Sequence, residues 1–138
     1  MRKFLIASHG HLASGMKSAL DILLGASNHV AVLDAYVDET RVEDKINEFY
    51  QQVDESDQVI LLSDLVGGSV NQMMYPYAAR KDTILISGIN LALVLELAAA
   101  ADQPITDEMI DQTIAMSQTM MQRVYFDDST EIEEEEFF

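Results

Sequence analysis

The sequence predicts an α/β fold, with a doubly wound, mainly parallel sheet of four or five strands and helices on both faces. Apolar runs of strand length alternate along the chain with stretches in which apolar residues recur at helical spacing. No Pro-rich or Ser-rich linker interrupts this alternation, and 138 residues suffice for one domain that buries a core without disulfides.

The first strand is predicted at residues 3–8, where the run KFLIAS is mostly apolar. A helix should follow, because apolar residues then recur every three or four positions until Gly25 supplies a stop signal. These positions are Leu12, Met16, Leu20 and Leu23. The chain therefore begins with one strand and one helix.

A second strand and helix repeat this pattern. The strand is predicted at residues 29–36, HVAVLDAY. Thr40 and Glu43 then have the spacing of a capping box at the start of a helix with one apolar face. The apolar positions of this face are Val42, Ile46, Phe49 and Val53.

The third strand, QVILLSD at residues 58–64, is the most continuous apolar run, as expected for a central parallel strand covered on both faces. The segment GGSVNQMMYPYAA leads from it into a helix, which Pro76 should bend or shorten. A fourth strand is predicted at residues 83–88, TILISG, and the apolar stretch NLALVLELAAAA should form the helix that packs on the sheet.

A last helix is predicted after Thr106, because Ile105 and Ile110 match the pattern of a hydrophobic staple. Beyond it, RVYFDD at residues 123–128 is a candidate edge strand. Strand and helix units of this length imply parallel strands with right-handed crossovers. We expect a flavodoxin-like strand order, in which the first and third strands flank the point where the order reverses.

The composition excludes several classes of function. The chain has no cysteine, so a disulfide framework and a thiolate metal site are impossible. Its net charge of -16 and only eight Lys and Arg argue against nucleic-acid binding and favour basic protein partners. The apolar run of MRKFLIASHG is too short for a signal or a membrane span, so we expect a soluble cytoplasmic protein.

The chain is predicted to divide into a domain at residues 1–125 and an acidic tail at residues 126–138. An edge strand could open the tail. The run Glu131–Glu136 is interpreted as a solvated end of the chain rather than as a site.

Two residues with catalytic potential lie at the ends of neighbouring predicted strands. His9 follows the first strand and Asp64 ends the third. Because ligands of such sheets bind beyond the carboxyl ends of the strands at the reversal point, we expect these two side chains to meet there. Asp64 would hold one ring nitrogen of His9 as a donor and leave the other free to act as a nucleophile.

The residues around this pair favour a phosphoryl group as the ligand. Gly67, Gly68 and Ser69 lie between a strand and a helix, where unpaired amides and the positive helix end favour anions. Ser8 and Gly10, on either side of His9, are predicted to complete the phosphate-binding set. Phosphoryl transfer requires mainly positioning and charge stabilisation, which such amides supply without a lysine.

The other two histidines are given less functional weight. His11 lies on the turn into the first helix, where we expect a rim residue or a weak phosphate contact rather than a catalytic group. His29 opens a strand far from the site in the predicted topology and is interpreted as structural. The methionines fit helix packing or a dimer surface better than a cofactor site.

The strand ending in His9-Gly10, together with the downstream motif DLVGGS at residues 64–69, resembles the enzyme IIA component of the mannose family of the bacterial phosphoenolpyruvate sugar phosphotransferase system. The resemblance covers residues 1–125. It implies that His9 accepts a phosphoryl group from the phosphocarrier HPr and passes it to an enzyme IIB partner that serves a membrane sugar permease, with Asp64 orienting the ring. It also implies a homodimer that exchanges an edge strand, which would give RVYFDD a role. No cofactor or metal is implied.

Three alternatives remain open. The family also includes a relative that acts in dihydroxyacetone phosphorylation. A flavodoxin-like nucleotide or flavin binder would use the same position, although the chain lacks the glycine-rich fingerprints of such sites. A metal site built from His9, His11 and Asp64 is the third. The chain also has Val70 and Asn71 where the family usually has proline and an aromatic residue, which bears on the partner and the sugar.

Overall fold

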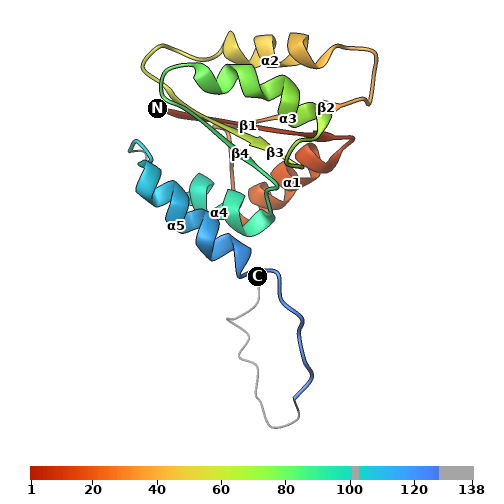
Figure 1. Cartoon of the computed structure of the whole chain (residues 1–138), viewed down its shortest axis with the longest axis vertical. Coiled ribbons are helices and arrows are strands. Elements are labelled where there is room, and N and C mark those ends of the chain that lie inside the picture. Colours follow the sequence, from red (N-terminus) through yellow and green to blue (C-terminus); the bar gives the residue numbers. More distant parts are fainter. Residues whose placement is uncertain (101–102, 128–138) are drawn as a thin grey trace.

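The computed structural model describes residues 1–100 and 103–127 and contains one four-stranded sheet. The elements in chain order are β1 (Arg2–His9), α1 (Leu12–Leu24), β2 (Val30–Ala35), α2 (Val42–Tyr50), β3 (Gln58–Ser63), α3 (Ser69–Met74), the 3-10 helix η1 (Tyr75–Ala79), β4 (Thr83–Ser87), α4 (Leu91–Ala99) and α5 (Asp107–Gln118). The expected α/β fold is confirmed (Figure 1).

All strand pairs in the sheet are parallel, and the strand order is β2-β1-β3-β4. This is the expected flavodoxin-like order, with the reversal point between β1 and β3. In the register, Ser8 pairs with Asp34 on one side of β1, while Ala7 pairs with Ser63 on the other. The carboxyl ends of β1, β2 and β3 therefore lie together at one edge of the sheet.

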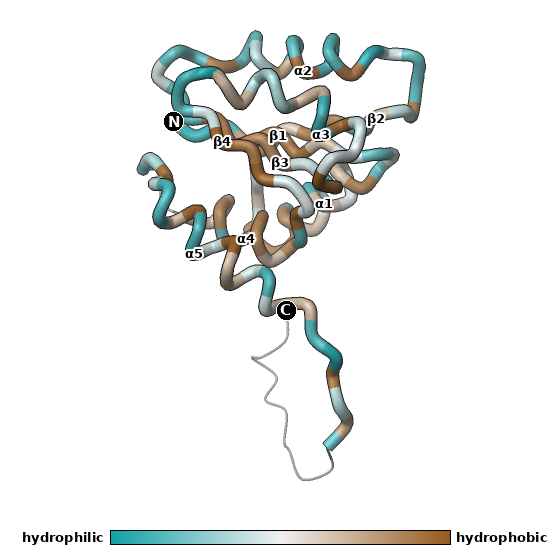
Figure 2. The backbone as a smooth tube through the Cα atoms, viewed as in Figure 1, coloured by the Kyte–Doolittle hydropathy of each residue, from teal (hydrophilic) through white to brown (hydrophobic). Residues whose placement is uncertain are grey.

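The helices cover both faces of the sheet, with α2 and α3 on one face and α1, α4 and α5 on the other (Figure 1). Successive residues of a strand point to opposite faces, and β1 supplies both cores in this way. Leu5 and Ala7 pack in the core under α2 and α3, whereas Phe4 and Ile6 pack in the core against α1, α4 and α5. Figure 2 shows hydrophobic strands in the interior, with α2 largely hydrophilic on one face of the sheet and α4 largely hydrophobic on the other.

One predicted helix start is confirmed by the structure, and another is wrong. Thr106 caps α5 as expected, because its side chain accepts a bond of 3.2 Å from the amide of Met109. The capping box predicted at Thr40 and Glu43 is wrong. The Asp38 carboxylate accepts a hydrogen bond of 2.9 Å from the Thr40 amide. Helix α2 starts one residue later than predicted, with Arg41 at its N-cap and no side-chain cap bond.

Two further predictions concern the helix that contains Pro76 and the candidate edge strand after α5. Pro76 shortens α3 to six residues, and the chain continues as η1. Residues 123–127 form no strand in the described part of the chain and are exposed, while Asp128 lies outside the described residues. No helix in the described segments is long and apolar enough to cross a bilayer.

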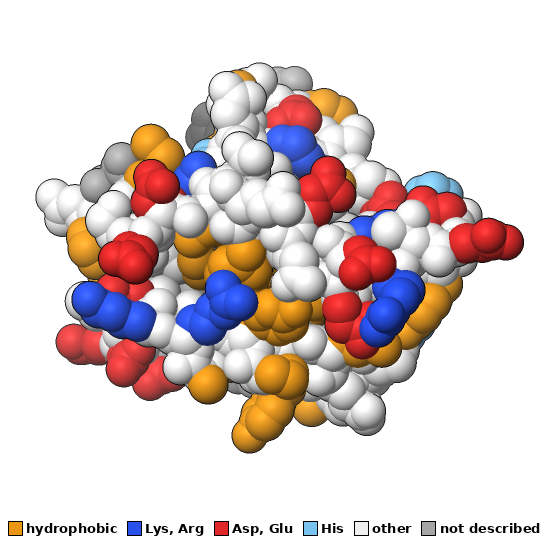
Figure 3. Space-filling view, turned by 90° about the horizontal axis from the view of Figure 1, so that it is seen from above, with side chains coloured by type: hydrophobic (Ala, Val, Ile, Leu, Met, Phe, Trp, Pro, Cys, Tyr) orange, Lys and Arg blue, Asp and Glu red, His pale blue; other side chains and the backbone are white. Residues whose placement is uncertain are grey.

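Charged side chains are spread over the surface of the domain. Figure 3, which views the face covered by α2 and α3, shows acidic side chains with Lys and Arg among them. Hydrophobic side chains fill the hollow between these charges (Figure 3). The negative charge of the chain is therefore not confined to its acidic C-terminal segment.

Candidate active site

His9 and Asp64 are in direct contact at the carboxyl edge of the sheet. His9 is the last residue of β1, and Asp64 directly follows the neighbouring strand β3. The Nδ1 atom of His9 lies 2.8 Å from Oδ2 of Asp64. The backbone amide of His9 donates to the same oxygen at 2.9 Å. The two residues that sequence reasoning placed together are therefore joined by two hydrogen bonds, one from the His9 ring and one from its backbone amide.

The surroundings of Asp64 keep its carboxylate charged. Burial acts to raise the pKa of Asp64, but the bonds that its carboxylate accepts from the amide and the ring of His9 outweigh it and hold the pKa below its usual value. Only 8% of the Asp64 side chain is exposed, compared with 42% of the His9 side chain. A carboxylate can only accept hydrogen bonds, so Nδ1 of His9 carries the proton and Nε2 is the free ring nitrogen.

Two hydroxyl groups, one after the other, lie beyond the free ring nitrogen of His9. The Oγ atom of Ser69 lies 3.2 Å from Nε2 of His9. The hydroxyl of Tyr36 lies 2.8 Å from Oγ of Ser69. The Tyr36 ring also faces the imidazole, with 5.5 Å between ring centroids. Sequence reasoning identified Ser69 but missed Tyr36. Nothing in the sequence marks a tyrosine directly after a strand as a site residue.

The loop between β3 and α3 requires its two glycines for different reasons. Gly67 has φ 72°, in the left-handed region that favours glycine. Gly68 lies against the histidine, since a Cβ there would be 3.6 Å from Cε1 of His9 and 3.2 Å from Cβ of Leu65. The first backbone bond of α3 runs from the Gln72 amide to the Gly68 carbonyl. The amides of residues 69–71 come before it, and these are the donors that a helix start leaves without a backbone partner.

Ser8 and Gly10, which were predicted to bind phosphate, use the Ser8 hydroxyl and the Gly10 amide in bonds to other parts of the chain. Ser8 is buried, and its hydroxyl accepts from the amide of Ala13 at 2.7 Å and donates to the carbonyl of Gly10 at 3.2 Å. The Gly10 amide donates to the carbonyl of Ala35 at 2.8 Å, at the end of β2. These bonds use the groups that were predicted to hold a phosphate, and they fix the loop after His9 instead.

His11 forms a second histidine–carboxylate pair beside the first. Its Nδ1 atom lies 3.0 Å from Oδ2 of Asp34, which also accepts from the Ser14 hydroxyl at 2.7 Å. Sequence reasoning missed Asp34, although a carboxylate near the end of a neighbouring strand was a usable signal. The two histidines turn to different carboxylates, and no group of three or more metal-ligating side chains occurs among the described residues.

His29 lies away from this edge. Its Nε2 atom is 3.2 Å from the carbonyl of Ala98, and its ring packs edge-on against Phe4. Both contacts are structural.

Exposed apolar side chains surround the His9 edge of the sheet. They come from the segments that directly follow β1, β2 and β3, and they are Leu12, Tyr36, Val37, Leu65 and Val66. An exposed histidine within an apolar rim is accessible to another protein surface.

The fold and this edge define a flavodoxin-like α/β protein with an exposed, carboxylate-oriented histidine. Residues 3–114 match the family model described as PTS system fructose IIA component, and the chain belongs to this family. The family resemblance that the sequence motifs indicate is thereby confirmed. The family consists of phosphotransferase-type components of the sugar phosphotransferase system, and it supports a phosphocarrier role for this chain.

Solved structures agree with this assignment. A protein of Klebsiella pneumoniae assigned to a phosphoenolpyruvate-dependent sugar phosphotransferase system is 27% identical, with a TM-score of 0.81 over 88% of this chain and 90% of that one. A IIA protein associated with the fucose utilization operon of Streptococcus pneumoniae is 26% identical, with a TM-score of 0.75 over 88% and 92%.

A more distant structure shares the fold alone. The mannose/sorbose-specific IIA subunit of Enterococcus faecalis is 19% identical, with a TM-score of 0.79 over 94% of this chain and 98% of that one. The search of curated proteins gave no match.

Proposed function

We propose that this chain is the IIA phosphocarrier of a sugar phosphotransferase system, which accepts a phosphoryl group from HPr on Nε2 of His9 and passes it to an enzyme IIB partner. The observation that carries the proposal is the bond of 2.8 Å between Nδ1 of His9 and the Asp64 carboxylate. It fixes the tautomer that leaves Nε2 free, in a chain that belongs to a IIA family.

The transfer step needs no proton to leave His9. The lone pair of Nε2 forms the new bond to phosphorus while the bond between phosphorus and the donor breaks, and the donor keeps the electron pair of that bond. Nδ1 retains its proton in the bond to Asp64, and the positive charge that develops on the ring lies against the carboxylate. Transfer to enzyme IIB is the reverse, in which Nε2 recovers its electron pair.

The groups near Nε2 can stabilise the phosphoryl oxygens. The Ser69 hydroxyl lies within hydrogen-bond distance of Nε2, and the amides at the start of α3 belong to the same loop. Such preorganised donors supply the charge stabilisation that phosphoryl transfer requires. At Gly68 the loop avoids the tight contact of 3.2 Å that a Cβ would make with Cβ of Leu65. Of the five residues predicted to bind phosphate, Gly67, Gly68 and Ser69 remain in this proposal.

The exposed position of His9 suits exchange between proteins. The apolar rim provides a surface on which a partner can exclude water, and the negative charge of the chain favours basic partners such as the proposed phosphocarrier. The family resemblance also leads us to propose a homodimer. The exposed side chains of Val124, Tyr125 and Phe126, after α5, offer apolar area for it.

A labelling experiment tests the proposal directly. The protein is incubated with phosphoenolpyruvate, enzyme I and HPr, and the bound phosphoryl group is measured by intact mass and by its stability in acid and base. We expect one acid-labile, base-stable group per chain, and none in His9→Ala. Labelling of His9→Ala at the wild-type level would overturn the assignment of His9.

A further inference from the structure

Tyr36 has an unusual backbone conformation at the edge of the site. It directly follows β2, and its φ of 66° lies in the left-handed region, which is rare for a large side chain. A strained conformation persists only where the surrounding structure holds it in place. At Tyr36 the carbonyl of the preceding Ala35 is held by the Gly10 amide at 2.8 Å. The conformation places the tyrosine ring beside the imidazole of His9.

The Tyr36 hydroxyl is not needed to hold its own turn. Lys45 donates to the Asp34 carbonyl at 2.9 Å, and Asp38 accepts from the Thr40 amide at 2.9 Å, so the chain on both sides of Tyr36 is fixed by other groups. Tyr36 is 56% exposed, so it adds little to the core. Its hydrogen bond of 2.8 Å to Ser69 therefore points to a role at the site.

The three polar groups form a chain whose direction follows from their chemistry. The Nε2 atom of neutral His9 can only accept, because Nδ1 carries the proton. Ser69 must then direct its single proton to Nε2, and its oxygen is left to accept from the Tyr36 hydroxyl. By donating to Oγ, the Tyr36 hydroxyl holds Ser69 in the orientation that directs its proton to Nε2.

We propose that Tyr36 is a positioning residue for phosphoryl transfer, acting through Ser69. This inference rests on the proposed function of His9. When Nε2 forms its bond to phosphorus, the lone pair that accepted from Ser69 is used in that bond. The Ser69 proton then turns to a phosphoryl oxygen, while Tyr36 continues to donate to Ser69 Oγ. Tyr36 thereby keeps Ser69 oriented in both states of the histidine.

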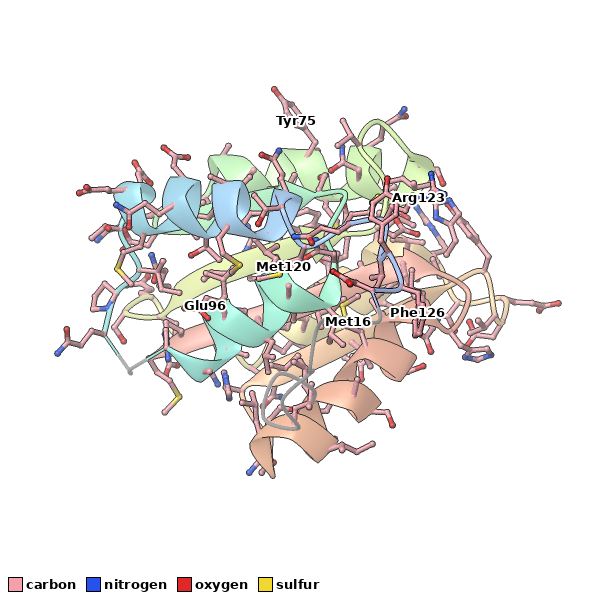
Figure 4. The ribbon with its side chains drawn as sticks, turned by 90° about the horizontal axis from the view of Figure 1, so that it is seen from below. Met16, Tyr75, Glu96, Met120, Arg123 and Phe126 are labelled. Carbon is pink, nitrogen blue, oxygen red and sulfur yellow. The ribbon has the colours of Figure 1, made fainter. Side chains whose placement is uncertain are left out.

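The test replaces Tyr36 by Phe, which keeps the ring beside His9 and removes only the hydroxyl. Tyr75→Phe is the matched control, because Tyr75 is also exposed, at 71%, and points outward from the domain (Figure 4). Single-turnover transfer from phosphorylated HPr is measured as a function of HPr concentration. We expect Tyr36→Phe to slow the step up to about tenfold, the effect of one hydrogen bond between neutral groups, with little change in the concentration for half-maximal rate. Tyr75→Phe should transfer at the wild-type rate.

A double-mutant cycle shows whether Tyr36 acts through Ser69. Ser69→Ala should slow transfer at least as much as Tyr36→Phe, and adding Tyr36→Phe to Ser69→Ala should give no further loss. Losses that multiply in the double variant would overturn the coupling to Ser69. A wild-type rate in folded Tyr36→Phe would overturn the role of Tyr36 altogether.

An NMR readout separates this inference from the proposed function. The 15N chemical shift of His9 Nε2 in the unphosphorylated protein should move in Tyr36→Phe and Ser69→Ala and stay unchanged in Tyr75→Phe. An unmoved shift in Tyr36→Phe would contradict the hydroxyl chain whatever the labelling shows. Absence of labelling in the wild-type protein, with the shift moving as expected, would instead contradict the proposed function.

Discussion

Two histidine–carboxylate pairs lie side by side at the carboxyl edge of the sheet, and by pairing distance alone they are nearly equivalent. The Nδ1 atom of His9 is 2.8 Å from the Asp64 carboxylate, and that of His11 is 3.0 Å from Asp34. Each carboxylate has a pKa below its usual value. A carboxylate that orients an imidazole is therefore not sufficient to distinguish a nucleophile from a surface histidine.

The difference lies in the surroundings of the other ring nitrogen. Nε2 of His9 meets the Ser69 hydroxyl, and the ring packs beside Tyr36. The His11 side chain is 78% exposed, compared with 42% for His9. Asp34 also differs from Asp64, because it accepts two bonds from Ser14 in addition to that of His11. The comparison leads us to propose that the groups around Nε2, and not the pairing itself, distinguish His9 as the phosphoryl acceptor.

The largest effect is expected from replacing each of the two histidines by alanine in turn. Because His9 is the proposed acceptor, with the Ser69 hydroxyl at its Nε2, His11→Ala should still acquire one group per chain in the labelling assay. His9→Ala should acquire none, although it retains the intact pair of His11 and Asp34. Peptide mapping of the labelled wild-type protein gives the same answer independently, and a label on His11 would remove the distinction between the pairs.

The second effect is expected from changing the carboxylates. Asp64→Asn should slow transfer about 10-fold to 100-fold, because the amide no longer selects the tautomer with Nδ1 as donor. Asp34→Asn makes the same chemical change at the neighbouring pair and should leave the transfer rate near that of the wild type. Rapid-quench kinetics with phosphorylated HPr measures both. Equal rates for Asp64→Asn and the wild type would exclude Asp64 from the mechanism.

A smaller effect is expected at Gly68, in the loop beside His9. Gly68 has φ -68°, which any residue adopts, so Gly68→Ala adds no backbone strain and acts through its Cβ. That atom would lie 3.2 Å from Cβ of Leu65, a tight contact, and 3.6 Å from Cε1 of His9, an ordinary contact. We expect Leu65 and the loop around it to shift and transfer to slow up to about tenfold, as for the loss of one hydrogen bond.

Gly15→Ala is the matched control for Gly68→Ala. Gly15 lies in α1, and a Cβ there would have no neighbour within 4 Å. The variant should transfer normally and gain about 0.5–1 kcal/mol of stability, because alanine favours the helix more than glycine does. Normal transfer by Gly68→Ala would show that the loop does not contribute to the site.

Much of the fold could be predicted because its signals are local. The central strand β3 follows from a continuous apolar run, and the ends of α1 and α5 follow from Gly25 and Thr106. The expected strand order then placed His9 beside Asp64. The start of α2 could not be predicted in the same way, since Thr40 and Asp38 compete for the same turn and the sequence does not show which prevails.

The site could be predicted only in part, since some of its groups depend on the path of the backbone. No sequence pattern signals the left-handed φ of Tyr36, which brings its ring to His9. The bond from the Gly10 amide to the Ala35 carbonyl depends on the exact register of two strands. Asp34 was accessible to sequence reasoning, because it lies near the end of a strand predicted to neighbour β1.

The smallest effect is expected in stability, where the two pairs should behave alike. A carboxyl group whose pKa is lower in the folded chain than in the unfolded chain stabilises the fold above its unfolded pKa, and this contribution is lost as the pH falls through the folded pKa. Burial acts to raise the pKa of Asp34, and the bonds from Ser14 and His11 outweigh it. Asp64 has the same direction of shift. Asp64→Asn and Asp34→Asn should therefore each lower the free energy of unfolding by about 1 kcal/mol at pH 7, with the deficit shrinking as the pH falls below the usual carboxyl pKa of about 4. Urea unfolding between about pH 7 and about pH 2 measures this, and a deficit that does not shrink in acid would mean that packing, not the charge of these carboxylates, supplies the stability of the two pairs.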